Sequence, residues 1–228
     1  MSLITVTKGA FQRAVQMPVT LTISFGAILI AFVSSAGELF QFDRAGLAAG
    51  EIWRLVTCHV VHWNAEHIQW DLLMFLVLGA ACEIRNPRRM WLCVAAAAAS
   101  VSLLVMCAFP GIESYRGLSG IDTALFTLLA IDLMRDAQRR QSGMLAATTG
   151  GLLLGFMGKT AYEAVTGHAF FVDQRSAGFE LLVWDHVAAS VAGAAIAFGT
   201  FSRHIPQEQR QRRIDFGQQS TPITDGVS

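Results

Sequence analysis

The chain has 228 residues, of which 53% are hydrophobic and 15% charged, and its formal net charge at pH 7 is zero. Soluble domains contain nearer ~25% charged residues, so this composition excludes an ordinary soluble domain, and the zero net charge offers no basic face for nucleic acid. We therefore expect one membrane domain that fills most of the chain. Its four cysteines, Cys58, Cys82, Cys93 and Cys107, lack CxxC or CxxH spacing, which favours small apolar residues over disulfides or metal ligands.

Six apolar segments follow one another along the chain, each near the ~20 residues that cross a bilayer core. They lie at about 18–37, 67–84, 90–109, 117–134, 143–165 and 180–201. This pattern predicts an all-α membrane protein, a six-transmembrane-helix bundle at 18–203. We expect a cytoplasmic N-terminal segment at 1–17 and a polar, disordered cytoplasmic tail at 204–228.

The distribution of cations predicts the orientation of this bundle. The loops on the N-terminal side carry Lys8, Arg13, Arg85, Arg88, Arg89, Arg135, Arg139, Arg140, Arg203, Arg210, Arg212 and Arg213. The opposite loops carry Arg44, Arg54, Arg116, Lys159 and Arg175. The positive-inside rule then places both termini in the cytoplasm, and the 38–66 loop on the outer side.

Polar residues gather around the start of the second span. His67 and Asp71 are four residues apart, so they share one helix face. With His59 and His62 of the preceding loop they offer ordinary zinc ligands, but the group lacks HExxH spacing, and we prefer an interpretation without metal. A metal-binding or transport protein stays open as an alternative.

The fourth span opens with Gly117-Leu118-Ser119-Gly120, which places a hydroxyl among glycines. Serine is a poor nucleophile unless a base takes its proton, and His186 of the sixth span is the candidate base. Small residues at four-residue spacing allow two helix backbones to approach closely. The sixth span has such a ridge, formed by Ala189, Gly193 and Ala197. The fourth span has a matching smooth face, formed by Gly117, Gly120 and Ala124. Close packing of these two helices would bring His186 to Ser119.

Each of these residues also has a structural interpretation. A serine among glycines is usually a packing residue, and an intramembrane histidine is often a hydrogen-bonded structural group or pore lining. Asp122 and Asp185 can satisfy helix ends or each other, and Trp53-Arg54 alone is an interfacial anchor.

Taken in order, the residues resemble the rhomboid family of intramembrane serine proteases over about 50–200. The matching elements are Trp53-Arg54, His62, His67, Glu83, Gly117-Leu118-Ser119-Gly120, and His186 with Ala189 and Gly193. The resemblance implies a catalytic dyad of Ser119 and His186 without a third acid, metal or organic cofactor. It also implies an oxyanion hole made by the Ser119 amide with His67 and the side chain at position 71.

Two residues depart from the family pattern. Asp71 stands where rhomboids usually have asparagine, and a carboxyl donates a hydrogen bond only when protonated. We expect Asp71 to be protonated in the working enzyme, or to point away and leave the oxyanion to His67 and the backbone. Thr123 stands where many rhomboids place an aromatic ring against the histidine, so His186 must be oriented by another group, such as Asp185.

The segments WRLVTCHVVHWNAEH, RGLSG and GKTAYEAVTG are similar to the rhombosortase branch, which is associated with Gly-Gly-type C-terminal anchors. This resemblance implies a bacterial inner-membrane protease whose partners are the bilayer and a membrane-anchored protein, with no requirement for oligomers. Substrate would enter by displacement of the fifth span, which its glycines weaken. The rival is a rhomboid-like pseudoprotease that binds membrane helices without cleaving them, and Asp71 is the residue that favours it.

Overall fold

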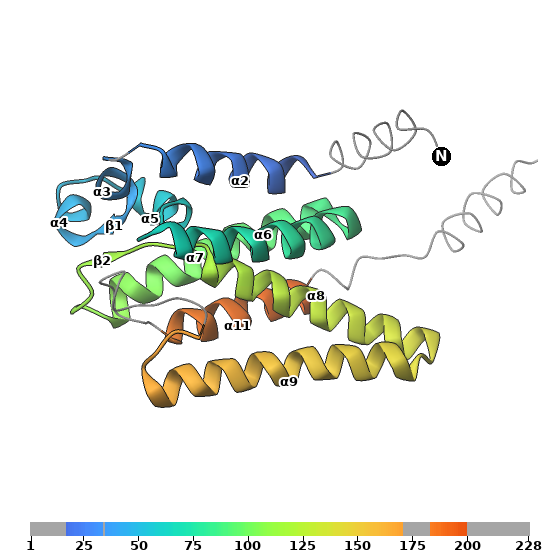
Figure 1. Ribbon diagram of the computed structural model, residues 1–228. Helices are drawn as coiled ribbons and strands as arrows, with labels where there is room; N and C mark the ends of the chain where they lie inside the picture. Colours follow the sequence, from blue (N-terminus) through green and yellow to red (C-terminus); the bar gives the residue numbers. More distant parts are fainter. Residues whose placement is uncertain (1–16, 34, 171–182, 200–228) are drawn as a thin grey trace, which may run out of the picture.

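The computed structural model describes residues 17–33, 35–170 and 183–199 (Figure 1). Its long helices are α2 (Pro18–Ala31), α6 (Ala65–Arg85), α7 (Pro87–Ala108), α8 (Ser119–Arg140), α9 (Gly143–Thr166) and α11 (Val183–Gly199). The shorter elements are α3 (Ala36–Phe40), β1 (Phe42–Asp43), α4 (Arg44–Ala48), α5 (Arg54–Thr57), η1 (Cys58–Val60) and β2 (Ser114–Tyr115). The predicted tail at 204–228 and nearly all of the predicted N-terminal segment lie outside the described residues.

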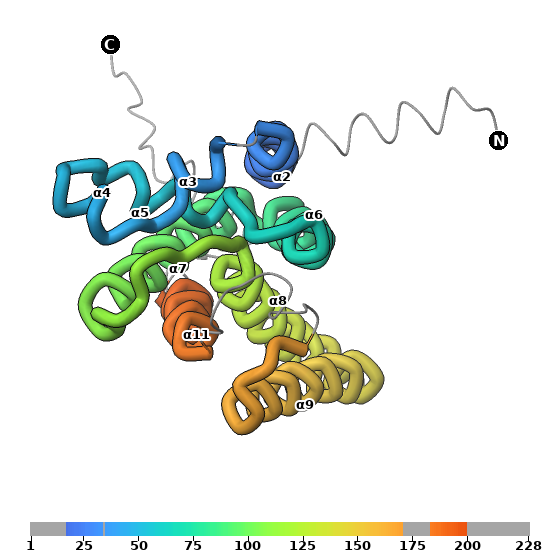
Figure 2. Tube along the Cα trace, turned by 60° about the vertical axis from the view of Figure 1, so that its left-hand side comes forward, coloured from blue at the N-terminus to red at the C-terminus, as the bar shows by residue number. Residues whose placement is uncertain are grey.

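The six long helices run side by side as one bundle, and each coincides with one predicted apolar segment. Helix α8 lies at its centre, in contact with α6, α7, α9 and α11, and α9 lies at one edge (Figure 2). Among the described residues, α6 and α7 are long and apolar enough to cross a bilayer, and α2 and α11 are shorter apolar helices. The helical class is thus confirmed, while six membrane crossings stay a prediction.

Two predicted boundaries were wrong. The first apolar segment does not continue to residue 37, because α2 ends at Ala31 and α3 starts anew at Ala36 with Glu38 in its first turn. Helix α8 runs beyond residue 134 to Arg140, since arginines in a last turn complement the helix dipole. It stops where Gln141 adopts a left-handed conformation.

A short antiparallel pair, in which Phe42 lies opposite Tyr115, joins the segment between α2 and α6 to the loop before α8. Arg44 extends from this pair to the C-terminal end of α7, where its Nη2 donates to the carbonyls of Val105 and Phe109 at 2.7 and 2.6 Å. These are carbonyls that a helix end leaves without intrahelical partners. The loop before α8 is therefore held in place from two sides.

Glu83 has a structural role at the opposite end of the bundle. It is fully buried, and its carboxylate accepts the backbone N–H groups of Val19 and Thr20 at 2.8 Å and the Thr20 hydroxyl at 2.6 Å. A carboxylate at a helix N-terminus satisfies free N–H groups and the helix dipole. Glu83 thus fixes α2 against α6, away from the candidate site.

The close contact between α8 and α11 is confirmed at Gly193. A Cβ atom there would collide with the carbonyl oxygen of Ala124, and Ala189 and Ala197 on either side are fully buried. The other two members of the predicted smooth face point elsewhere. Gly120 lies against Val101 of α7 and Gly117 against His67 of α6.

Gly193→Ala should destabilise the bundle, because the added methyl group forces two backbones apart. We expect a loss of about 1–3 kcal/mol, measured by SDS-induced unfolding of the purified protein in detergent. Gly199→Ala in the same helix is the matched control, since a Cβ there meets nothing within 4 Å. Equal stability of the two variants would contradict close packing at Gly193.

Candidate active site

Ser119 is placed by a constrained loop at the start of α8. Gly117 has a φ of +129°, which favours glycine, and its N–H donates to the carbonyl of Cys58 at 3.0 Å. A Cβ atom at Gly117 would lie 3.0 Å from Nε2 of His67 and 3.2 Å from Oδ2 of Asp71. The loop therefore passes directly against the start of α6, and Ser119 follows two residues later.

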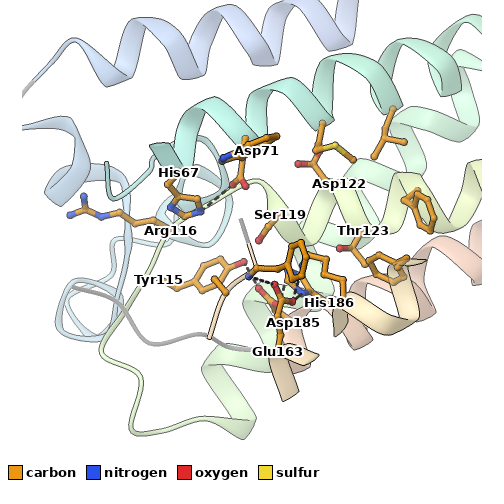
Figure 3. A pocket seen from close by; sticks show the side chains of 18 of the residues that line it. His67, Asp71, Tyr115, Arg116, Ser119, Asp122, Thr123, Glu163, Asp185 and His186 are labelled. Atoms are coloured by element: carbon orange, nitrogen blue, oxygen red, sulfur yellow. Dashed lines mark hydrogen bonds and ion pairs between the residues drawn. The ribbon is translucent and has the colours of Figure 1, made fainter. Parts of the chain in front are cut away.

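Ser119 and His186 line the same cavity, which has a volume of about 880 Å³. Figure 3 shows Ser119 between His67 and Asp71 on one side and His186 on the other. His186 is 5% exposed and starts the buried face of α11 that continues through Gly193. The structure thus brings together the predicted nucleophile, base and oxyanion residues.

Asp71 is the centre of a polar cluster at the top of α6. Its Oδ2 accepts the backbone N–H of Leu118 at 2.8 Å, and lies 3.3 Å from Nε2 of both His62 and His67. The rings of the two histidines meet edge to face, with centroids 5.1 Å apart. Asp71 therefore holds the residue before Ser119, a contact that the sequence did not indicate.

His62 and Arg116 complete this side of the site. Burial lowers the pKa of His62 from its ordinary value, although the Asp71 carboxylate opposes the shift, so the ring is neutral at pH 7. Arg116 stacks over the Trp63 ring at 4.3 Å and donates to the side chain of Gln41 at 2.9 Å. These contacts hold the Arg116 guanidinium at the wall of the cavity.

The other histidine between α2 and α6, His59, does not line the cavity. Nε2 of His59 donates to the carbonyl of Ala98 and to Oγ of Ser102 on α7, at 3.2 and 3.1 Å. The predicted alternative of a four-residue metal group is not assembled, because His59 is turned from Asp71. Within residues 17–33, 35–170 and 183–199 no cluster of three or more such side chains is arranged for a metal ion.

The remaining supporting residues shape the scaffold. Arg54 is 8% exposed, and its guanidinium binds Glu51 and the carbonyls of Glu38 and Gln41 at 2.5, 2.6 and 3.1 Å. Trp53 is 49% exposed, which is compatible with the expected interfacial anchor. Neither residue lines the cavity.

Two residues beside His186 were missed in the sequence. Tyr115 donates its hydroxyl to Oδ2 of Asp185 at 2.8 Å, and Glu163 of α9 places Oε2 3.7 Å from Nδ1 of His186. Burial and the negative charge of Asp185 raise the pKa of Tyr115, which therefore stays a donor. Two features of the sequence could have indicated these residues. Tyr115 comes shortly before Ser119, and Lys159 precedes Glu163 by four residues, the spacing of an ion pair on one helix face.

A helical bundle with a half-buried serine and a buried histidine on adjacent helices, both lining one cavity, defines a candidate serine hydrolase of the membrane. The chain matches the Rhomboid domain family model over residues 49–203, which is more than half of its length. The chain belongs to the rhomboid family, whose members are generally intramembrane serine proteases, with some pseudoproteases. The family and the apolar helices together indicate a membrane protein. No curated protein matches the chain.

The stability of the segment between α2 and α6 should depend on pH through His59, which is 1% exposed. Burial lowers its pKa from 6.5 to about 4, so folding favours the neutral ring. Its contribution is present above pH 6.5 and is lost as pH falls towards 4, which amounts to about 3 kcal/mol.

SDS-induced unfolding at pH 7 and pH 4.5 measures this loss. His59→Gln keeps an N–H donor but cannot titrate, so its stability should change less between the two pH values than that of the wild type. Equal changes in both proteins would assign the pH dependence to other groups.

Proposed function

We propose that this protein is an intramembrane serine endopeptidase with Ser119 as nucleophile and His186 as general base. It cleaves a peptide bond in or next to the transmembrane segment of a membrane-anchored protein. The observation that supports this most is that both side chains line one cavity between tightly packed helices. The family match over residues 49–203 supports the same reaction class.

In this mechanism Oγ of Ser119 attacks the peptide carbonyl carbon while His186 takes the hydroxyl proton. His186 then returns that proton to the leaving amine nitrogen, the C–N bond breaks, and an acyl-enzyme ester remains. A water molecule, deprotonated by His186, hydrolyses this ester and restores Ser119. The residues of the chain supply every proton transfer, so the proposal requires no metal or organic cofactor.

We assign the oxyanion hole to the backbone N–H of Ser119 and to the polar cluster of His67 and Asp71. Preorganised donors of this kind contribute a few kcal/mol each to transition-state stability. Oδ2 of Asp71 already accepts the N–H of Leu118, so a protonated carboxyl would hold the loop and donate to the oxyanion at once. An ionised carboxylate would only hold the loop and leave the oxyanion to His67.

The membrane orientation extends this proposal. Ser119 starts α8, whereas Asp132 near its other end binds Arg89 of α7 through two hydrogen bonds of 2.8 and 3.1 Å. Because the arginine-rich end favours the cytoplasm, the cavity lies towards the outer face of a bacterial inner membrane. The loop spacing and RGLSG support a rhombosortase whose substrates carry Gly-Gly-type anchors.

The second candidate function is a pseudoprotease that binds membrane helices without cleavage. Asp71 favours it, since an ionised carboxylate beside the cavity would repel an oxyanion. The presence of both Ser119 and His186 on the cavity wall argues against it, because a binder needs neither an activated hydroxyl nor a base.

Labelling by a serine-directed fluorophosphonate probe tests the dyad in detergent-purified protein. We expect wild type to be labelled, and Ser119→Ala and His186→Ala to lose labelling by at least about 10³-fold. Ser100→Ala on α7 is the matched control, as its hydroxyl bonds its own helix, and it should label normally. A folded wild type that resists labelling between pH 5 and 9 would favour the binding-only function.

The pH dependence of labelling tests the state of Asp71. If the protonated carboxyl serves the oxyanion, the labelling rate falls as rising pH ionises it, and Asp71→Asn stays active over that range. Asparagine keeps a carbonyl acceptor for the Leu118 N–H and supplies a permanent donor. Matching pH profiles in wild type and variant would instead assign Asp71 to holding the loop.

A further inference from the structure

His186, the base of the proposed dyad, has a buried ring nitrogen that forms no hydrogen bond within α11. Nδ1 of His186 makes no hydrogen bond to any residue that the structure describes. A buried polar atom without a partner costs about 1–3 kcal/mol, and such atoms at a functional site call for an explanation. The acidic group in its direct vicinity is Glu163 of α9, with Oε2 at 3.7 Å.

Glu163 is held in place by contacts of its own. It is 2% exposed; its Oε2 accepts from Nζ of Lys159 at 2.8 Å, and its Oε1 accepts from the backbone N–H of Phe170 at 3.0 Å. A buried carboxylate is stable only when paired in this way. Its position is therefore fixed by α9 and the segment that follows.

A second carboxyl lies near the other ring nitrogen. Oδ1 of Asp185 is 3.6 Å from Nε2 of His186, while its Oδ2 is engaged by the Tyr115 hydroxyl. The other titratable groups that line the cavity come from α6, α8, α9 and the loop before α8, namely His67, Asp71, Asp122, Lys159, Glu113, Tyr115 and Arg116. A proton placed on Nε2 towards Asp185 would stop that nitrogen from accepting the serine proton. A group at Nδ1 is needed to keep Nε2 free.

We infer that Glu163 is a positioning residue for His186, and that it accepts the Nδ1–H so that Nε2 receives the Ser119 proton. The inference rests on the proposed Ser119–His186 dyad and extends it to a third residue. The same logic operates wherever a carboxylate selects the tautomer of a catalytic histidine. Here the carboxylate comes from α9, whose contact with α11 is small compared with that between α8 and α11.

The test compares wild type with Glu163→Gln in the fluorophosphonate assay from pH 5 to 9. Glutamine keeps the shape and an oxygen for Phe170 or Lys159, but its NH₂ favours an unprotonated Nδ1 and the wrong tautomer. We expect labelling to be roughly ten- to a hundredfold slower. We also expect the pH midpoint of labelling to move down by about one unit, because a negative charge beside the ring is removed.

The matched control is Glu66→Gln, the same change at an exposed position of α6 outside the cavity, which should label like wild type. An unchanged rate and midpoint in Glu163→Gln would overturn the positioning role and leave the dyad standing. A wild type that is never labelled would overturn the proposed function itself.

A second measurement does not depend on reactivity. In the Ser119→Ala background, ¹⁵N spectra of His186 at pH 8 report which ring nitrogen carries the proton. The positioning role predicts Nδ1–H with Glu163 present and a shift towards Nε2–H in Glu163→Gln. The Nε2–H form in both proteins would refute the inference even if labelling were slow in Glu163→Gln.

Discussion

The structure depends on how closely α8 approaches α11. The Ala124 carbonyl of α8 occupies the space that a side chain at position 193 would need. The separation of the two helices is therefore set by contact between their backbones. In a bilayer the hydrophobic effect does not drive helix association, and such packing is one of the terms that replaces it. Because Ser119 and His186 project from these two helices, the geometry of the proposed dyad is determined by the scaffold.

At the end of the bundle away from the cavity, polar side chains join neighbouring helices. Glu83 links α6 to α2 through three hydrogen bonds, and Asp132 links α8 to Arg89 of α7 through two. At the cavity, three buried polar atoms lack a hydrogen-bond partner among the described residues. They are Oδ1 of Asp122, Oδ1 of Asp185 and Nδ1 of His186. In an apolar surrounding such unpaired atoms are costly, and these three belong to side chains that line the cavity of the candidate site.

The sequence predicted which segments are helices, because apolar runs and span length are local properties. It also predicted the Gly193 ridge, since small residues at four-residue spacing have one main use between helices. It failed for Gly117 and Gly120, because the rotation of α8 about its axis decides whether a glycine faces α6, α7 or α11. It also missed Glu163, whose relation to His186 exists only after α9 folds back along α8.

Helix α9 can therefore influence both access and chemistry. Its inner surface meets α8 through the Phe126–Phe156 ring pair, with centroids 4.9 Å apart. A Cβ atom on Gly151, Gly155 or Gly158 would meet nothing within 4 Å, so these positions do not lock α9 to its neighbours. If a substrate helix enters by displacing α9, Glu163 moves away from His186 in the same step. Under the proposed function, substrate entry and orientation of His186 would then exclude one another, and cleavage would require α9 to return to its position beside His186.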